Sequence, residues 1–179
     1  MTLSSCLRPS ADTSETVSAE CCEDCTFCHV SSKNGFQVVY EAYLIVCQNT
    51  DFIAFQDRSP AAEHHFLVVP RRHIGSVKVL RQADVPLVKQ MEEIGHACLD
   101  DLQVPPTRRR MGFHIPPFNS VDHLHLHVLG LPFRNWLVRH KYPIVAGIHG
   151  YVKGYSWFAE VSQTVQILQN GGSIKVNCC

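Results

Sequence analysis

The run from Val121 to Leu129, VDHLHLHVL, alternates histidine with aliphatic residues. Successive side chains of a β-strand point to opposite faces, so the run predicts a strand with three imidazoles on one face and aliphatic side chains on the other. The imidazoles are His123, His125 and His127, and the aliphatic residues are Leu124, Leu126 and Val128. Because histidine titrates near neutral pH, the imidazole face offers hydrogen-bond donors, a nucleophile and proton transfer.

Two other interpretations of this run need to be weighed. An edge strand with a semi-polar outer face would also alternate histidine and leucine. One metal ion bound by all three rings is excluded on a regular strand, because the outer two backbones lie about 13 Å apart and zinc holds each ring nitrogen at about 2 Å.

The chain has 179 residues, which predicts one domain with a sizeable core. Lys plus Arg and Asp plus Glu are both 16, so the net charge is zero. This balance argues against a stable nucleic-acid partner and against a membrane partner.

We expect residues 1–20 to be a disordered leader, residues 21–170 to be the folded domain and residues 171–179 to be a flexible tail. The leader has no apolar stretch long enough for a signal peptide or a membrane span. The nine cysteines are then expected to be reduced thiols, which favours a cytoplasmic and nuclear location. Cys178-Cys179 resembles a doubly prenylated end, but with only Lys175 as nearby basic support we expect no lipid.

The pattern of the remaining chain predicts an α+β fold. Strands are expected at residues 36–40, 43–47, 52–55, 66–69, 111–115 and 123–129. Asp84 and Pro86 are typical of a helix start, and the helix that follows carries an apolar stripe formed by Leu87, Met91, Ile94, Cys98 and Leu102. Residues 136–141 and 161–168 are further helix candidates. One helix lying on the leucine face of an antiparallel sheet accounts for these elements.

Three motifs together resemble the histidine triad superfamily of nucleotide hydrolases and transferases. They are the His-x-His-x-His run, Phe55-Gln56-Asp57 followed by Ser59-Pro60, and the run from His65 to His73, HFLVVPRRH. The likeness spans roughly Cys25 to Leu131. It implies a five-stranded antiparallel sheet with one long helix and a C-terminal helix, dimerising through a continuous sheet into a homodimer or a higher oligomer.

Within the superfamily, the segments 111–118 and 155–158 most closely resemble the histidine triad nucleotide-binding protein 3 branch, an adenosine 5'-monophosphoramidase. The implied reaction is hydrolysis of the P–N bond of AMP or other purine nucleoside phosphoramidates, with aminoacyl adenylates as further substrates. By the resemblance, His125 attacks the α-phosphorus while its other ring nitrogen donates to a backbone carbonyl. His127 and His65 then hydrogen-bond the phosphate oxygens, and Ser120 lies near the leaving amine.

The resemblance also implies the nucleotide contacts. Asp57 is expected to hold the ribose hydroxyls, and His125, Leu126 and His127 are expected to contact the nucleotide. Phe27, Val30 and Phe55 are candidates for an adenine pocket, with ordinary core packing as an equal alternative. The sequence departs from the family at two of the expected contacts: Arg58 stands where an aliphatic residue is usual, and Asn119 stands where some branches carry glutamine. Trp136 and Trp157 are both candidates for the leaving-group pocket.

Cys25-x-x-Cys28 is a weak metal signal by itself. Beside His73 and His123 it resembles a zinc site found in some superfamily members and related uridylyltransferases, so a structural zinc is a hypothesis for these four residues. No cofactor is expected to be needed for catalysis.

Other functions stay open at this point. One is a different superfamily hydrolase, acting on dinucleoside polyphosphates or removing adenylate from nucleic-acid ends as aprataxin does. The latter is expected to need a basic surface and a zinc finger after the triad, and the sequence has neither. Another is a nucleotide-binding interaction protein with vestigial catalysis, against which the complete histidine set argues.

Overall fold

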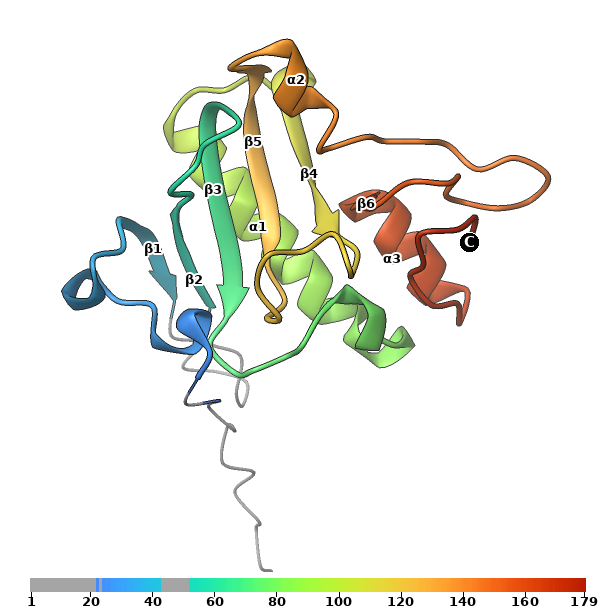
Figure 1. Ribbon diagram of the computed structural model, residues 1–179, viewed down its shortest axis with the longest axis horizontal. Coiled ribbons are helices and arrows are strands. Elements are labelled where there is room, and N and C mark those ends of the chain that lie inside the picture. Colours follow the sequence, from blue (N-terminus) through green and yellow to red (C-terminus); the bar gives the residue numbers. More distant parts are fainter. Residues whose placement is uncertain (1–21, 23, 43–51) are drawn as a thin grey trace, which may run out of the picture.

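The computed structural model describes residues 22, 24–42 and 52–179. Six strands form one antiparallel sheet in the order β1-β2-β3-β5-β4-β6 (Figure 1). They are β1 (Val38–Ala42), β2 (Phe52–Gln56), β3 (Ala62–Pro70), β4 (Arg109–His114), β5 (Leu126–Phe133) and β6 (Phe158–Glu160). The α+β class is confirmed, but the expectation of five strands is wrong. The expected leader and the expected strand at 43–47 lie outside the described residues.

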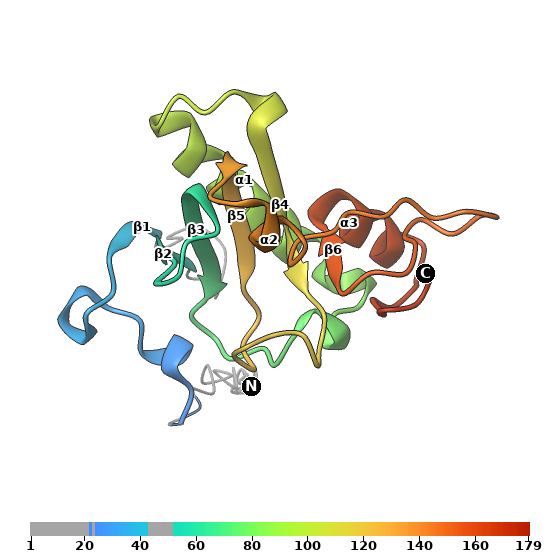
Figure 2. The ribbon, with the colours of Figure 1, turned by 45° about the horizontal axis from the view of Figure 1, so that its top comes forward.

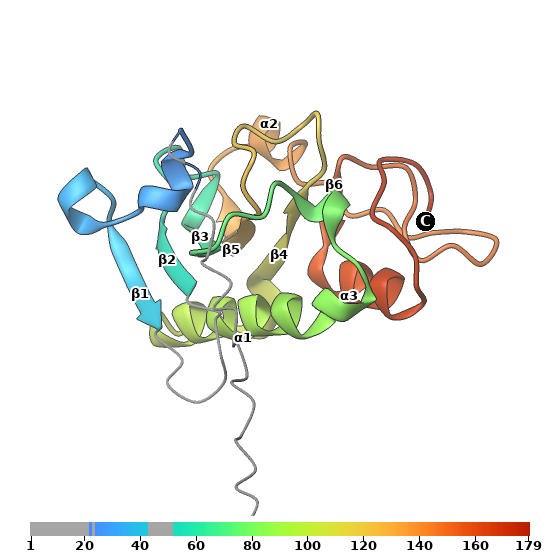
Figure 3. The ribbon, with the colours of Figure 1, turned by 90° about the horizontal axis from the view of Figure 1, so that it is seen from below.

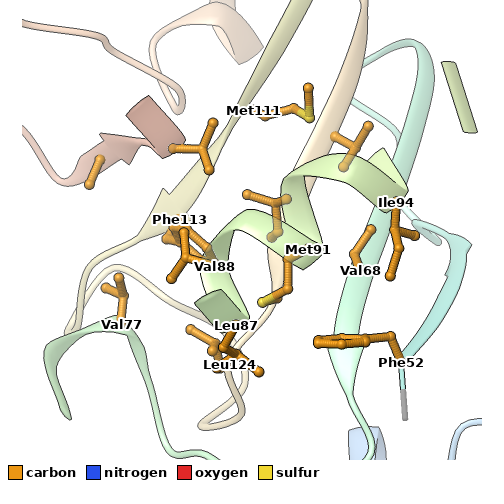
Figure 4. Close-up of a cluster of buried hydrophobic side chains, with 14 of the residues drawn as sticks. Phe52, Val68, Val77, Leu87, Val88, Met91, Ile94, Met111, Phe113 and Leu124 are labelled. Carbon is orange, nitrogen blue, oxygen red and sulfur yellow. The ribbon is translucent and has the colours of Figure 1, made fainter. Parts of the chain in front are cut away.

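One long helix, α1 (Val85–Asp101), covers one face of the sheet (Figure 3). Its apolar stripe is buried as predicted, except that Leu102 follows the helix and is exposed. The buried side chains pack against β3, β4 and β5 in one apolar core (Figure 4). Gly95 brings the helix close to the sheet, since a Cβ there would lie 2.8 Å from side-chain atoms of both Met111 and Val128.

The histidine run keeps its two faces, although the hydrogen-bonded strand begins only at Leu126. Leu124, Leu126 and Val128 are buried in the core beneath α1. The sheet ladder does not reach further back, because β3 ends at Pro70, which has no N–H to donate. The backbone N–H of Leu124 instead donates to the Ile74 carbonyl.

The sixth strand, β6, pairs with β4 and leads directly into α3 (Val161–Gln169). Figure 2 shows both elements beside β4, next to the C-terminus. Three residues are too few to show a period-2 pattern, which explains why the sequence does not predict β6. The predicted helix at 161–168 is confirmed, and the candidate at 136–141 forms the short helix α2 (Trp136–Arg139).

Residues 171–179 pack against the domain, so the prediction of a flexible tail is wrong. Ile174 is buried in the main core, and the backbone of Cys179 exchanges hydrogen bonds with that of Lys153. The buried Lys153 ammonium donates to four carbonyls, including those of Lys175 and Val176. Sequence periodicity cannot reveal a segment that is held in this way by backbone carbonyls. Of the helices in the described ranges, none is long and apolar enough to cross a membrane.

Gly112 is where β6 comes closest to β4, and we expect Gly112→Ala to lower the free energy of unfolding by about 1–3 kcal/mol. A Cβ at this position would overlap the Ala159 carbonyl oxygen and the Phe158 ring. Gly75→Ala is the control, because nothing lies within 4 Å of a Cβ there. Urea denaturation measures the stability of both variants. Equal stabilities would show that β6 shifts to accommodate the added methyl group without a loss of stability.

Candidate active site

A cleft of about 530 Å³ opens on the side of the sheet that faces away from α1, because its lining residues His114 and His127 alternate with residues of the core beneath that helix. Its volume falls within the range of small-molecule sites. It is lined by Asp57, Ser59, His114, Phe118, Ser120, His127, Lys141, Tyr142 and Trp157. His125 lines a smaller hollow of about 10 Å³ that shares His114 with the cleft. The cleft is therefore assembled from β4 and β5, from the loops after β2, β4 and α2, and from the residue before β6.

The His125 ring is oriented by its own segment. Its Nδ1–H donates to the His123 carbonyl at 2.6 Å, which leaves the lone pair on Nε2. The edge-on ring of Phe27, at a centroid distance of 5.4 Å, supports it from the side. Burial lowers the pKa of His125, against the opposing effects of that hydrogen bond and of Asp57. The imidazole is thus neutral near pH 7 and presents a nitrogen nucleophile.

Three further histidines form one hydrogen-bonded chain across the sheet. His65 Nδ1 accepts from the Ala61 N–H at 3.1 Å, so the proton of His65 is on Nε2, 2.9 Å from His127 Nδ1. His127 Nε2 lies 2.9 Å from His114 Nδ1, and His114 Nε2 lies 2.8 Å from the Lys141 carbonyl. A backbone N–H only donates and a carbonyl only accepts, so both ends of the chain require the same tautomer in all three rings. Each ring carries its proton on Nε2.

Burial keeps these three hydrogen-bonded histidines neutral. It lowers the pKa of His65 to about 4, against an opposing effect of Asp57, whose carboxylate lies 3.5 Å from His65 Nε2. It also lowers the pKa of His127 and of His114, in which the neighbouring histidines assist. Near pH 7 the three rings are therefore uncharged, as their fixed tautomers require.

This arrangement bears on the predicted phosphate contacts of His65 and His127. Both nitrogens of each ring already have a hydrogen-bond partner, either a neighbouring histidine or a backbone group. A phosphate oxygen can accept from either ring only by replacing one of those partners. The contact with phosphate stays a prediction, and the structure identifies which hydrogen bonds it would break.

Ser120 and Asp57, two other predicted site residues, line the cleft. The Asp57 carboxylate accepts from the Ser59 N–H at 2.7 Å. The Asn119 amide turns back on its own loop, donating to the Val121 carbonyl and to Asp122.

Several predicted nucleotide contacts lie in apolar packing instead. The side chain of Leu126 lies in the core beneath α1, on the opposite side of the sheet from the cleft. Phe27, Val30 and Phe55 belong to a second buried cluster on the histidine side of the sheet, which favours the core alternative for them. Arg58 lies over the ring of Phe36, 4.8 Å from its centroid.

The sequence interpretation missed Ser59, His114, Phe118, Lys141 and Tyr142 as lining residues. His114 could have been found, because in the strand at 109–114 alternation places it on the side opposite the buried Met111 and Phe113. The others lie in loops, where no regular alternation predicts the direction in which a side chain points. Of the two tryptophan candidates, Trp157 lines the cleft and Trp136 is 72% exposed.

The four predicted metal ligands converge beside the His125 segment. The possible ligand atoms of Cys25, Cys28, His73 and His123 all lie within 4.8 Å of one another. His123 Nδ1 is 3.4 Å from Cys25 Sγ and 3.6 Å from Cys28 Sγ, and its Nε2–H donates to the Pro70 carbonyl. The nitrogen that faces the thiols therefore carries the lone pair.

Comparison with known proteins identifies the family of this fold. A family model described as "Scavenger mRNA decapping enzyme C-term binding" matches residues 24–142. An adenosine 5'-monophosphoramidase HINT3 of Danio rerio is 32% identical over 161 residues, which cover 88% of this chain and 89% of that protein. The chain belongs to the histidine triad superfamily.

Two further matches to superfamily members differ in how much of the matched protein they cover. The HINT3 adenosine 5'-monophosphoramidase of Mus musculus is 43% identical over 107 residues, covering 59% of this chain. The matched part is 62% of the mouse protein, which is less than two thirds of its length. The crystal structure of a HIT family hydrolase from Legionella pneumophila superposes with a TM-score of 0.52 at 24% identity, over 63% of this chain and 97% of that one, and shows the shared fold.

The three buried, hydrogen-bonded histidines make the stability of the folded protein depend on pH. An unfolded histidine titrates near 6.5, whereas burial lowers the pKa of folded His65 to about 4. Between these values the unfolded state binds a proton that the folded state does not. Stability is therefore full above about pH 6.5 and falls as the pH drops toward 4, by about 1.4 kcal/mol per pH unit for each such histidine.

Urea denaturation at about pH 7 and about pH 5 measures this dependence. We expect the loss of stability between the two pH values to be smaller in His65→Gln than in the wild-type chain. An equal loss of stability in both proteins would show that the protonation of His65 does not cause the pH dependence.

Proposed function

We propose that this chain hydrolyses the P–N bond of purine nucleoside 5'-phosphoramidates, AMP amides above all, through a covalent nucleotidyl intermediate on His125. The observation that carries the proposal is the 2.6 Å hydrogen bond from His125 Nδ1 to the His123 carbonyl. It fixes the tautomer so that Nε2 is the nucleophilic nitrogen. The likeness to adenosine 5'-monophosphoramidases supports the choice of substrate class.

The reaction has two displacements at phosphorus. In the first, His125 Nε2 bonds to the α-phosphorus as the P–N bond breaks, and the amine leaves with the bonding electron pair and a proton taken from solvent, which the attacking water returns in the second displacement. The imidazole becomes cationic, and its Nδ1–H remains hydrogen-bonded to the His123 carbonyl, which favours that charge. In the second, water attacks the phosphorus, the bond to Nε2 breaks, and AMP leaves with neutral His125 restored.

The cleft offers groups for two parts of such a substrate, the ribose and the departing amine. Asp57 offers a carboxylate to the ribose hydroxyls, and Ser120 a hydroxyl near the departing amine. Phe118 and Trp157, with ring centroids 5.6 Å apart, form an apolar wall suited to an aromatic or aliphatic amine. Aminoacyl adenylates place the same phosphorus before His125 and are proposed as further substrates. The homodimer and the cytoplasmic and nuclear location stay predictions.

We expect His125→Ala to lower turnover of an AMP–tryptamine phosphoramidate by about 10³-fold or more. AMP binding, followed by calorimetry, should be retained. The matched control is His64→Ala, since His64 lies on the opposite face of β3 from His65 and should leave turnover unchanged. Full activity of the His125 variant would overturn the mechanism.

Turnover of diadenosine triphosphate by the wild-type chain tests the neighbouring reaction class. We expect kcat/KM at least about tenfold higher for the phosphoramidate, because an apolar wall accommodates an amine better than a second charged nucleotide. Faster cleavage of diadenosine triphosphate would make the chain a polyphosphate hydrolase, and neither activity would make it a binding protein.

We also propose that Cys25, Cys28, His73 and His123 hold a structural zinc ion. In a tetrahedral site with bonds of about 2.0–2.3 Å, neighbouring ligand atoms lie about 3.5 Å apart, and three of the sulfur–nitrogen separations in this cluster are 3.4, 3.5 and 3.6 Å. The tautomer of His123 presents the correct nitrogen. Such an ion would cross-link the N-terminal turn to the histidine run and supply no chemistry to the reaction.

Metal analysis of the purified chain should find about one zinc per protein and almost none after Cys25→Ser with Cys28→Ser. The variant should also unfold at a lower temperature, because the cross-link is lost. Cys22→Ser is the control, as this exposed thiol is outside the cluster. A metal-free wild-type chain would remove the site from the proposal.

A further inference from the structure

We propose that His114 is a positioning residue that holds His127 in the one tautomer able to donate a hydrogen bond into the cleft. The inference rests on the proposed function and deepens it, because it concerns how the same site contacts the substrate phosphate. The two rings are in direct contact, with their centroids 4.6 Å apart.

The tautomer of His127 depends on the groups that face its two nitrogens. Nδ1 accepts from the Nε2–H of His65, but His65 Nε2 also lies 3.5 Å from the Asp57 carboxylate, so the His65 contact can be exchanged and does not fix the tautomer by itself. Nε2 faces Nδ1 of His114, which is a lone pair because the proton of His114 is used on the Lys141 carbonyl. Among the residues with described side chains, His114 Nδ1 is the only acceptor within hydrogen-bond distance of His127 Nε2.

The nitrogen that His114 keeps protonated is the one on the substrate side. His65 is fully buried, whereas His114 itself lines the cleft. When a phosphate oxygen enters, it replaces His114 Nδ1 as the acceptor of the His127 proton. No covalent bond breaks and no proton is transferred, so the donor is already in place before substrate arrives.

The surroundings keep the His114 ring itself from turning. Tyr142 lies 5.0 Å away and Phe158 of β6 lies 5.3 Å away, each measured between ring centroids. Its Nε2–H is fixed on the Lys141 carbonyl at 2.8 Å. The strand that the sequence failed to predict and the segment after α2 thus set the direction of a hydrogen bond at the site.

Two amide variants separate the two ring nitrogens of His114. The Asn side chain places its oxygen near the position of Nδ1, so His114→Asn keeps an acceptor for His127. The Gln side chain places its amide near Nε2, so His114→Gln keeps the contact with Lys141 and loses the acceptor. We expect kcat/KM to fall about 10- to 100-fold in His114→Gln and in His114→Leu, and to stay within about threefold in His114→Asn.

Long-range ¹H–¹⁵N spectra of the histidine rings give a readout that does not depend on turnover. Recorded in the inactive His125→Ala background, they should show His127 protonated on Nε2 with His114 or Asn at position 114. With Leu at this position, they should show exchange between its two tautomers. A His127→Gln spectrum assigns the signal.

The outcomes separate the inference from the proposed function. An unchanged His127 tautomer in the Leu variant overturns the inference even where His125→Ala confirms the nucleophile. A changed tautomer with unchanged kcat/KM also overturns it, because the hydrogen bond then does not serve the reaction. Loss of activity in Asn and Leu alike, with the fold retained, would show that His114 acts through something other than its acceptor nitrogen. Each of these results can arise whether or not His125 proves to be the nucleophile.

Discussion

Burial of one face of a single run against α1 controls the geometry of this protein. Leu124, Leu126 and Val128 are each about 1% exposed or less, and they lie under the helix together with its apolar stripe. Since a one-residue shift would turn these aliphatic side chains to the histidine side and the imidazoles into the apolar core, the register of the run is strongly specified. The imidazoles therefore lie on the side of the sheet that carries the cleft, where His127 lines it.

A second constraint then acts on the imidazoles. A neutral ring has one proton for two nitrogens, so a row of rings is satisfied only when each donor meets an acceptor. Here the Ala61 N–H and the Lys141 carbonyl fix the two ends of one row, and the His123 carbonyl fixes His125 separately. Burial opposes protonation throughout, which lets fixed tautomers persist at neutral pH. The backbone of ordinary strands and turns therefore prepares the side chains for chemistry.

Local sequence predicted what depends on local periodicity. The helix at 85–101, its stripe, the two faces of the histidine run and the convergence of Cys25 with His123 all follow from spacing or from resemblance, and the structure contains them. The short strand β6, the packed residues 171–179 and the role of the Lys141 carbonyl depend on contacts between distant segments. No pattern in the sequence reports which carbonyl will meet which ring.

His123 shows how the two proposed centres share one residue without competing for it. Its ring points its lone pair at the thiols of Cys25 and Cys28, and its Nε2–H is held by the Pro70 carbonyl. Its own carbonyl accepts from the nucleophilic ring of His125. Any force that fixes the His123 ring, including a bound zinc ion, also fixes the carbonyl that selects the tautomer of His125. The order of the run thus matters as well as its alternation, because the residue that anchors the segment stands two places before the proposed nucleophile.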